Sequence, residues 1–246
     1  MTSTKLNASN DISAQILGLT DKHIHYFEQP QIHTSSAKVS GIHQQMLDGY
    51  EALVSAAAKA GLTIKIASGF RSFERQLHIW NNKFTGKGVI KNINGDPVNI
   101  DELTELEIIN AILLYSALPG ASRHHWGCDI DIYDEILLAG QTLQLEAWEY
   151  SNTGPMAKLS TWLEGNIAKY DFYFPYDSFR GGIAAEPWHL SYAPLANQYQ
   201  STMDLALLKQ CLLQTDIAGK NTIIENLSDI FTRYITNVNT NQLPIT

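Results

Sequence analysis

Two short segments contain residue types that could bind a metal ion and activate a water molecule. The first, residues 122–131, reads SRHHWGCDID, and the second, residues 186–189, reads EPWH. Two imidazoles and one carboxylate can hold a catalytic zinc ion and leave a fourth position open for water, while a second carboxylate acts as base. Together the two segments predict a metal-dependent hydrolytic site.

The pattern of the first segment leaves its ligands open. Asp129 and Asp131 would share one face of an expected strand, so either carboxylate could be the ligand, and His125 competes with His124 in the same way. In a continuous strand His124 and Asp131 would face opposite sides, but Gly127 permits a bend or bulge that turns both toward one ion. A buried histidine capped by a nearby carboxylate accounts for this segment equally well.

The second segment favours a turn that leads into a strand. Pro187 disfavours a helical conformation at Glu186, so we expect Glu186 in a turn and His189 at the start of the strand. The apolar neighbours Trp188 and Leu190 would lower the local dielectric around a charged site. The two segments together indicate a metal site more strongly than either does alone.

Apolar spacing along the chain predicts the elements that position these segments. It predicts a helix over Val39–Ala60, a strand over 63–67, and a helix over 73–84 with Ser72 as its N-cap. Further helices are expected at 101–118, 154–170, 203–213 and 222–235, further strands at 128–133, 171–176 and 188–192, and a short strand or turn near 23–27. Because strands are few and do not alternate regularly with helices, we predict an α+β fold. Helices flank a small, mostly antiparallel sheet, and a helical C-terminal extension follows.

Composition excludes some functions and leaves others open. The chain has 246 residues, of which 44% are apolar, and a net charge of −8, which fits one globular domain and argues against nucleic-acid binding. No stretch approaches the length of a membrane span, and the two cysteines, Cys128 and Cys211, are expected to stay thiols. The first residues lack a signal-peptide pattern, so we expect a cytoplasmic location; a chain trimmed of a leader would look the same and be periplasmic or exported.

The motifs resemble those of a known enzyme family. The pattern S-x-H-x-x-G-x-x-x-D at 122–131 and EPWH at 186–189 resembles the VanY-type D-alanyl-D-alanine carboxypeptidases, peptidase family M15. That group also holds D-Ala-D-Ala dipeptidases and the hedgehog signalling domain. The upstream SGFRS at 68–72 is similar to a third motif of the family, with Phe70 in place of tyrosine. The resemblance covers roughly residues 40–195.

The resemblance implies a role for seven residues. It places one zinc ion on His124, Asp131 and His189. It makes Glu186 the general base and Arg71 an electrostatic helper, and it places the substrate's terminal carboxylate near Ser122 and Gln76. The sequence departs from the family at Asp129, where a small residue is common, and at Arg123, where an acidic residue is frequent.

We therefore expect a zinc-dependent carboxypeptidase that removes a C-terminal D-alanine from peptidoglycan-type peptides. The alternatives are a D-Ala-D-Ala dipeptidase, a cell-wall endopeptidase, a non-catalytic zinc-binding module, and a partner-binding protein that works through its helical tail. The expected division is an N-terminal extension over 1–35, partly irregular, a zinc peptidase core over 36–195, and a helical C-terminal extension over 196–246 packed on the same domain.

Overall fold

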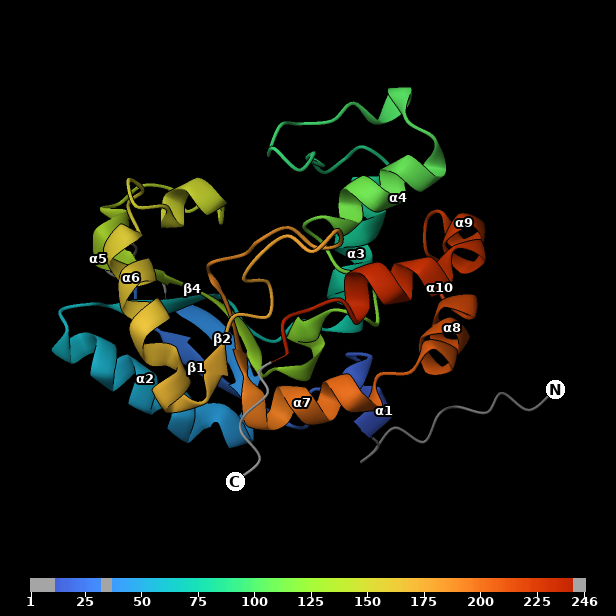
Figure 1. Ribbon diagram of the computed structural model, residues 1–246. Coiled ribbons are helices and arrows are strands. Elements are labelled where there is room, and N and C mark those ends of the chain that lie inside the picture. The colour runs from blue at the N-terminus through green and yellow to red at the C-terminus, as the bar shows by residue number, and fades with distance from the viewer. Residues whose placement is uncertain (1–11, 32–36, 241–246) are drawn as a thin grey trace.

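The strands of the computed structural model, which describes residues 12–31 and 37–240, form two antiparallel sheets (Figure 1). The larger sheet has the order β3-β4-β6-β5 and consists of β3 (Ile64–Ser68), β4 (Asp129–Asp134), β6 (His189–Tyr192) and β5 (Phe172–Tyr173). The smaller sheet pairs β1 (Ile24–Gln29) with β2 (Lys38–His43). Neighbouring strands are antiparallel in both sheets.

Helices lie around the larger sheet and continue beyond it. The first six are α1 (Ile12–Ile16), α2 (Leu47–Lys59), α3 (Phe73–Phe84), α4 (Glu105–Leu113), α5 (Glu135–Leu138) and α6 (Ala157–Asn166). The last four are α7 (Ala193–Thr202), α8 (Leu205–Leu213), α9 (Lys220–Glu225) and α10 (Leu227–Ile230). Figure 1 shows α8, α9 and α10 gathered on the side of α3 and α4, away from α2 and α6. The Trp80 indole of α3 donates a hydrogen bond to the carbonyl of Ala218, 3.1 Å away, and so ties the C-terminal helices to the rest of the chain.

Strand pairing brings the two motif segments together. In the β4–β6 register Asp131 lies opposite His189, and Asp129 lies opposite Ser191. On the other side of β4, Asp131 lies opposite Ser68, the last residue of β3. Residues far apart in the sequence therefore meet at one end of the sheet.

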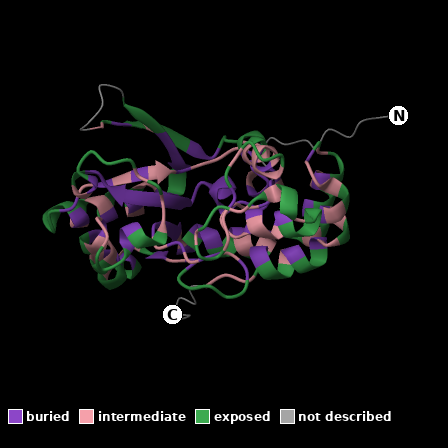
Figure 2. Cartoon of the chain, turned by 90° about the horizontal axis from the view of Figure 1, so that it is seen from above, coloured by how far each residue is buried: buried purple, intermediate pink, exposed green. Residues whose placement is uncertain are grey.

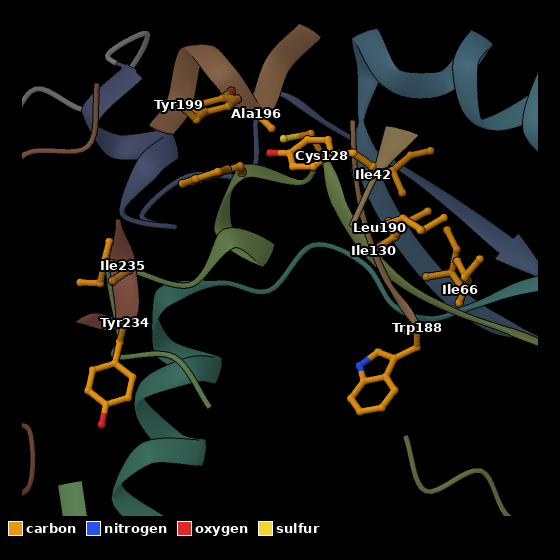
Figure 3. Packing of buried hydrophobic residues seen from close by; sticks show 14 of the residues in the cluster. Ile42, Ile66, Cys128, Ile130, Trp188, Leu190, Ala196, Tyr199, Tyr234 and Ile235 are labelled. Carbon is orange, nitrogen blue, oxygen red and sulfur yellow. The ribbon is translucent and has the colours of Figure 1, made fainter. Parts of the chain in front are cut away.

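Strand β4 separates the core from the site by simple alternation. Ile130 and Ile132 are fully buried and face the opposite side of the sheet from Asp129 and Asp131. Figure 3 shows Ile130 close to Leu190, in the apolar cluster that also contains Ile66 and Ile42. Strands β4 and β5 are buried along their whole length, β1 is largely exposed, and Figure 2 shows exposed residues on the outer faces of the helices. The acidic side chains thus project from a rigid, packed support.

The fold confirms the predicted α+β class, with its small antiparallel sheet and helical C-terminal part. The predicted helix over 73–84 matches α3, and the Ser72 hydroxyl accepts a hydrogen bond from the Arg75 amide at 3.2 Å, as expected of an N-cap. The predicted strands at 63–67, 128–133, 171–176 and 188–192 correspond to β3, β4, β5 and β6, and the short strand or turn expected near 23–27 is the strand β1.

Two helix predictions need correction. The predicted helix over Val39–Ala60 was wrong at its start: residues up to His43 form β2, because they pair along β1, and the α-helix begins only at Leu47. The helix predicted over 101–118 is shorter, because the Thr104 hydroxyl and the Glu107 carboxylate form a capping box that starts α4 at Glu105. Apolar spacing alone did not show either boundary.

Of the bend or bulge expected at Gly127, the structure shows a bend. Arg123–Trp126 is a short 3-10 helix, and Gly127 ends it with a φ of 73°, in the left-handed region. A side chain there would also collide with Ile24, since an added Cβ would lie 2.3 Å from the Ile24 Cδ1. The turn of the chain before β4 is therefore a helix cap.

The domain division remains a prediction. Of the N-terminal extension over 1–35, residues 1–11 and 32–35 lie outside the described residues, as do residues 241–246 of the C-terminal extension. Across the described ranges, no helix is long and apolar enough to cross a membrane.

Candidate active site

Three side chains from the two motif segments converge on one point. His124, Asp131 and His189 each offer a ligand atom, and these atoms lie within 4.8 Å of one another. The Nε2 of His124 lies 3.3 Å from one Asp131 oxygen, and the Nδ1 of His189 lies 3.2 Å from the other. All three residues are buried. This is the ligand set that the sequence resemblance implied.

Each imidazole is oriented by a bond on its far nitrogen. The Nδ1 of His124 lies 3.0 Å from the Gly69 carbonyl, which leaves Nε2 directed at Asp131. The Nε2 of His189 lies 2.9 Å from an Asp129 oxygen, which leaves Nδ1 directed at Asp131. Metal-ligating histidines commonly use their second nitrogen in this way, because the bond fixes both tautomer and ring orientation.

The donor set fits a zinc ion. In the part of the chain that the structure describes, the buried Nδ1 of His189 and Oδ1 of Asp131 have no hydrogen-bond partner, although they lie only 3.2 Å apart. Buried polar atoms are rarely left unpaired in native proteins. A divalent cation shared by these atoms and His124 Nε2 would satisfy both, and two nitrogens with one carboxylate oxygen are ligands that zinc accepts.

Two members of the triad, His189 and Asp131, have pKa values shifted in opposite directions by their surroundings. Burial by itself would lower the pKa of His189, but the carboxylates of Asp129, Asp131 and Glu186 outweigh it and raise that pKa well above the usual value. Burial would raise the pKa of Asp131, yet the neighbouring His124 and His189 lower it overall. A cation at the triad would take over the role of the imidazolium charge.

Glu186 lies beside the triad without completing it. One of its carboxylate oxygens is 3.2 Å from the Nδ1 of His189. Its own amide donates to the Tyr176 carbonyl at 2.9 Å, and its carbonyl accepts from the His189 amide at 3.1 Å. The turn expected at Pro187 is present, and β6 begins at His189. The carboxylate is therefore placed where a base for a water molecule would stand.

Arg71 enters the site from the turn between β3 and α3. Its guanidinium donates to the Gln76 side-chain oxygen at 2.8 Å and to the Ser68 hydroxyl at 2.9 Å. Burial lowers the pKa of Arg71, while the charges of Asp131 and Glu186 act to raise it. Two hydrogen bonds to protein groups thus hold the guanidinium in place at the wall of the cavity.

The two residues implied for substrate binding occupy different places. Ser122 lines the cavity next to the triad. Gln76 is fully buried and absent from the cavity wall; its oxygen accepts from Arg71, and its nitrogen donates to the Ala117 carbonyl at 2.7 Å. In this structure Gln76 touches Arg71 and not the space where a substrate would lie.

The triad and Glu186 open onto a cavity of about 690 Å³. Its polar wall includes the cationic side chains of Arg71, Lys83, Lys91 and Arg123, and the Lys83 ammonium donates to the Ser116 hydroxyl at 2.6 Å. Four exposed apolar side chains also line it: Val89, Ile93, Trp148 and Phe179. Cavities in this size range bind small organic ligands, and this one combines positive charge with apolar surface.

The alternatives left open by the sequence take other positions. His125 packs behind the site: its Nε2 accepts from the Gly120 amide at 3.1 Å, and its Nδ1 lies 2.6 Å from the Arg71 carbonyl. Asp129 shares a strand face with Asp131, as predicted, but it contacts the far side of His189. Neither belongs to the group that could hold a metal.

Sequence reasoning did not single out Lys83, Tyr176 or the apolar lining. The Tyr176 ring packs edge-on against His189 with centroids 5.0 Å apart. Lys83 lies on the same face of α3 as Gln76, two helical turns further along, and the helix that follows the SGFRS motif was the available signal.

Comparison with known proteins agrees with this geometry. Residues 39–195 match the family described as VanY, D-alanyl-D-alanine carboxypeptidase. This chain belongs to that family. The matched range contains the three motifs and the whole four-stranded sheet.

Individual relatives of this VanY-family protein cover different shares of it. An uncharacterized protein of Haemophilus influenzae is 39% identical over 121 residues, which are 48% of this chain and 92% of the relative. The putative carboxypeptidase YodJ of Bacillus subtilis is 26% identical over 154 residues, and this chain spans only 46% of it. The solved LdcB LD-carboxypeptidase, 20% identical, matches with a TM-score of 0.50 over 86% of this chain and 78% of that one, which shows a shared fold.

Proposed function

We propose that this protein is a zinc-dependent carboxypeptidase that removes a C-terminal D-alanine from peptidoglycan-type peptides. The observation that carries the proposal is the open triad of His124, Asp131 and His189, with the free carboxylate of Glu186 next to it on the wall of a large cavity. Three protein ligands are typical of catalytic zinc sites, whereas structural sites usually have four.

The residues of the chain divide the chemical work. One zinc ion held by the triad would supply Lewis acidity and acidify the attacking water. Glu186 would take a proton from that water and deliver it to the nitrogen of the leaving amino acid. Arg71, fixed by Gln76 and Ser68, would donate hydrogen bonds to the oxyanion that develops on the scissile carbonyl.

The cavity favours a peptide over a free dipeptide as substrate. A volume of about 690 Å³ lies in the range that holds drug-sized ligands, and D-Ala-D-Ala would fill only a small part of it. The exposed Trp148 and Phe179 offer apolar surface to the part of a substrate that lies before the cleaved bond. We therefore favour the carboxypeptidase activity over the dipeptidase activity.

The experiment combines metal analysis with a substrate panel. The purified protein should contain about one zinc per chain, and mass spectrometry should show release of one D-alanine from a muropeptide pentapeptide. Free D-Ala-D-Ala and a tetrapeptide ending in a single D-alanine complete the panel. The matched control is Glu186→Gln, which keeps the shape of the side chain and removes the base.

The outcomes separate the rival functions. Cleavage confined to the free dipeptide would assign a dipeptidase, and cleavage confined to the tetrapeptide would assign a carboxypeptidase acting after an L-configured centre. Stoichiometric zinc without hydrolysis of any panel member would leave a metal-binding module. The predicted cytoplasmic location implies that released muropeptides are the substrate pool, which fractionation with an antibody would test.

A further inference from the structure

Behind the proposed metal ligand His189 lies a buried ion pair that the mechanism does not use. Asp129 is fully buried, and its Oδ1 lies 2.9 Å from the Nε2 of His189. The same oxygen accepts from the Nε of Arg123 at 2.7 Å. Arg123 and Asp129 lie six residues apart in the first motif segment, and their side chains meet directly.

Every nitrogen of the Arg123 side chain and both oxygens of Asp129 have a hydrogen-bond partner. The remaining nitrogens of Arg123 donate to the Gln200 side-chain oxygen at 2.7 Å, to the Tyr173 hydroxyl at 2.9 Å and to the Ser191 hydroxyl at 2.8 Å. Ser191 in turn donates to the second Asp129 oxygen at 3.0 Å. A buried charge is tolerated only with such partners, so the network holds the carboxylate in one orientation.

The network also reaches the C-terminal helices. Gln200 lies on α7, and its nitrogen donates to the carbonyl of Ile235 at 3.3 Å. Ile235 ends the last described helical turn of the chain. A continuous path of hydrogen bonds therefore runs from the proposed metal ligand through the ion pair to the helical tail.

We propose that the Asp129–Arg123 pair is a positioning device for the metal site. Asp129 accepts the Nε2 proton of His189, holds the imidazole in the tautomer whose Nδ1 faces Asp131, and makes that nitrogen a better metal donor. Arg123 holds the Asp129 carboxylate in this orientation through the hydrogen bond from its Nε. The inference rests on the proposed function for the identity of His189 as a ligand, and it adds residues that touch neither substrate nor metal.

The physical argument concerns which nitrogen is free. A neutral imidazole carries one proton, and the nitrogen opposite a carboxylate acceptor keeps a lone pair for the metal. Without Asp129 the proton could sit on Nδ1 and compete with the cation. Outer carboxylates of this kind typically change metal affinity by about 10–100-fold.

The test measures affinity for Co²⁺ and Zn²⁺ by competition with a chromophoric chelator, together with the visible absorption spectrum of the Co²⁺ form. Asp129→Asn removes the charge but keeps an oxygen at the same place. The double variant Arg123→Met/Asp129→Ala removes both charges, so that neither is left buried alone and the chain can still fold. Tyr173→Phe is the control, because it removes one bond to Arg123 and none to Asp129.

We expect Asp129→Asn and the double variant to bind both metals about 10–100-fold more weakly, with a changed Co²⁺ spectrum, while Tyr173→Phe stays within about threefold of wild type. A folded double variant with wild-type affinity and spectrum would overturn the inference, and so would an equal loss in Tyr173→Phe. Wild-type protein that binds Co²⁺ yet hydrolyses no muropeptide would overturn the proposed function alone. Absence of metal binding by wild type would overturn both.

Discussion

The two sides of the His189 ring differ in how completely their polar groups are satisfied. On the cavity side, Nδ1 faces Asp131 and Glu186 at 3.2 Å from each, and within the described residues it has no hydrogen-bond partner. On the buried side, Nε2 meets Asp129, which is itself bound by Arg123 and Ser191. One side is closed by protein groups, and the other has donor atoms available for a cation.

This difference distinguishes the groups that could bind a metal ion or substrate from those that hold the site in place. A site that must bind and release reactants keeps unsatisfied atoms facing a cavity, at a cost in stability. A supporting network satisfies every buried charge, because an unpaired one would be strongly destabilising. His189 takes part in both, because its Nε2 contacts the buried Asp129 and its Nδ1 faces the cavity.

The largest expected effects come from the cavity side. Glu186→Ala should keep the metal and the fold but lower kcat by about 10²–10⁴-fold, because no group is left to carry the proton. His189→Ala should lose the metal itself, since one of three protein ligands is removed. Elemental analysis and steady-state kinetics on both variants check this. Equal loss of metal in the two variants would instead make Glu186 a metal ligand.

Arg71 tests whether a cation on the cavity side serves the transition state. Arg71→Ala should lower kcat by about 10²–10³-fold, the usual cost of removing an oxyanion donor, and raise KM by less. Gln76→Leu should show a smaller loss of the same kind, since Gln76 reaches the cavity only through Arg71. An effect confined to KM would instead assign Arg71 to ground-state binding of the substrate carboxylate.

Lys83 should contribute to binding rather than to the chemical step. No carboxylate among the described residues lies within ion-pair distance of its ammonium, which lines the cavity. Lys83→Met should raise KM by about tenfold with little change in kcat, as expected for a lost bond to an anionic substrate group. Lys91→Met is the matched control, because Lys91 also lines the cavity but is paired with Glu146. Equal KM changes in both variants would argue for a general charge effect.

His43 lies outside the triad and the Asp129–Arg123 pair. We expect its substitution to have the smallest effect, a change in how stability depends on pH that reports on burial. Burial, and then the nearby His23, lower the pKa of His43 to about 4, and its Nδ1 accepts from the Gln45 amide. Because the unfolded state takes up a proton near pH 6.5 and the folded state does not, stability should fall as pH drops from about 6.5 toward 4.

His43→Asn keeps a capping acceptor and cannot titrate. Chemical unfolding at pH 7 and pH 5 should therefore show a smaller pH-dependent loss in the variant than in wild type. An identical loss in the two proteins would mean that His43 titrates normally, and burial alone would then not account for the contrast with His189, whose pKa is raised.

The sequence by itself determined the fold class, most element positions and the residues of the candidate site. Periodicity carries this information because an amphipathic helix or strand must repeat its apolar positions to bury one face. The family motifs predicted the residues of the site, and His124, Asp131 and His189 do converge in the structure. The choice between Asp129 and Asp131 could not be read from alternation, which places both on one face of β4.

The family resemblance implied Asp131, and the tertiary structure supplies the physical reason for that choice and the contacts around it. Antiparallel pairing of β4 with β6 sets Asp131 opposite His189 and Asp129 opposite Ser191, and so gives the two carboxylates different partners. The start of α2 was likewise decided by pairing, since β2 forms where β1 offers it a backbone edge. Arg123 and Gln200 are far apart in sequence and meet only when the C-terminal helices dock. Such contacts depend on hydrogen-bond register and packing between distant segments, which no local pattern of residues encodes.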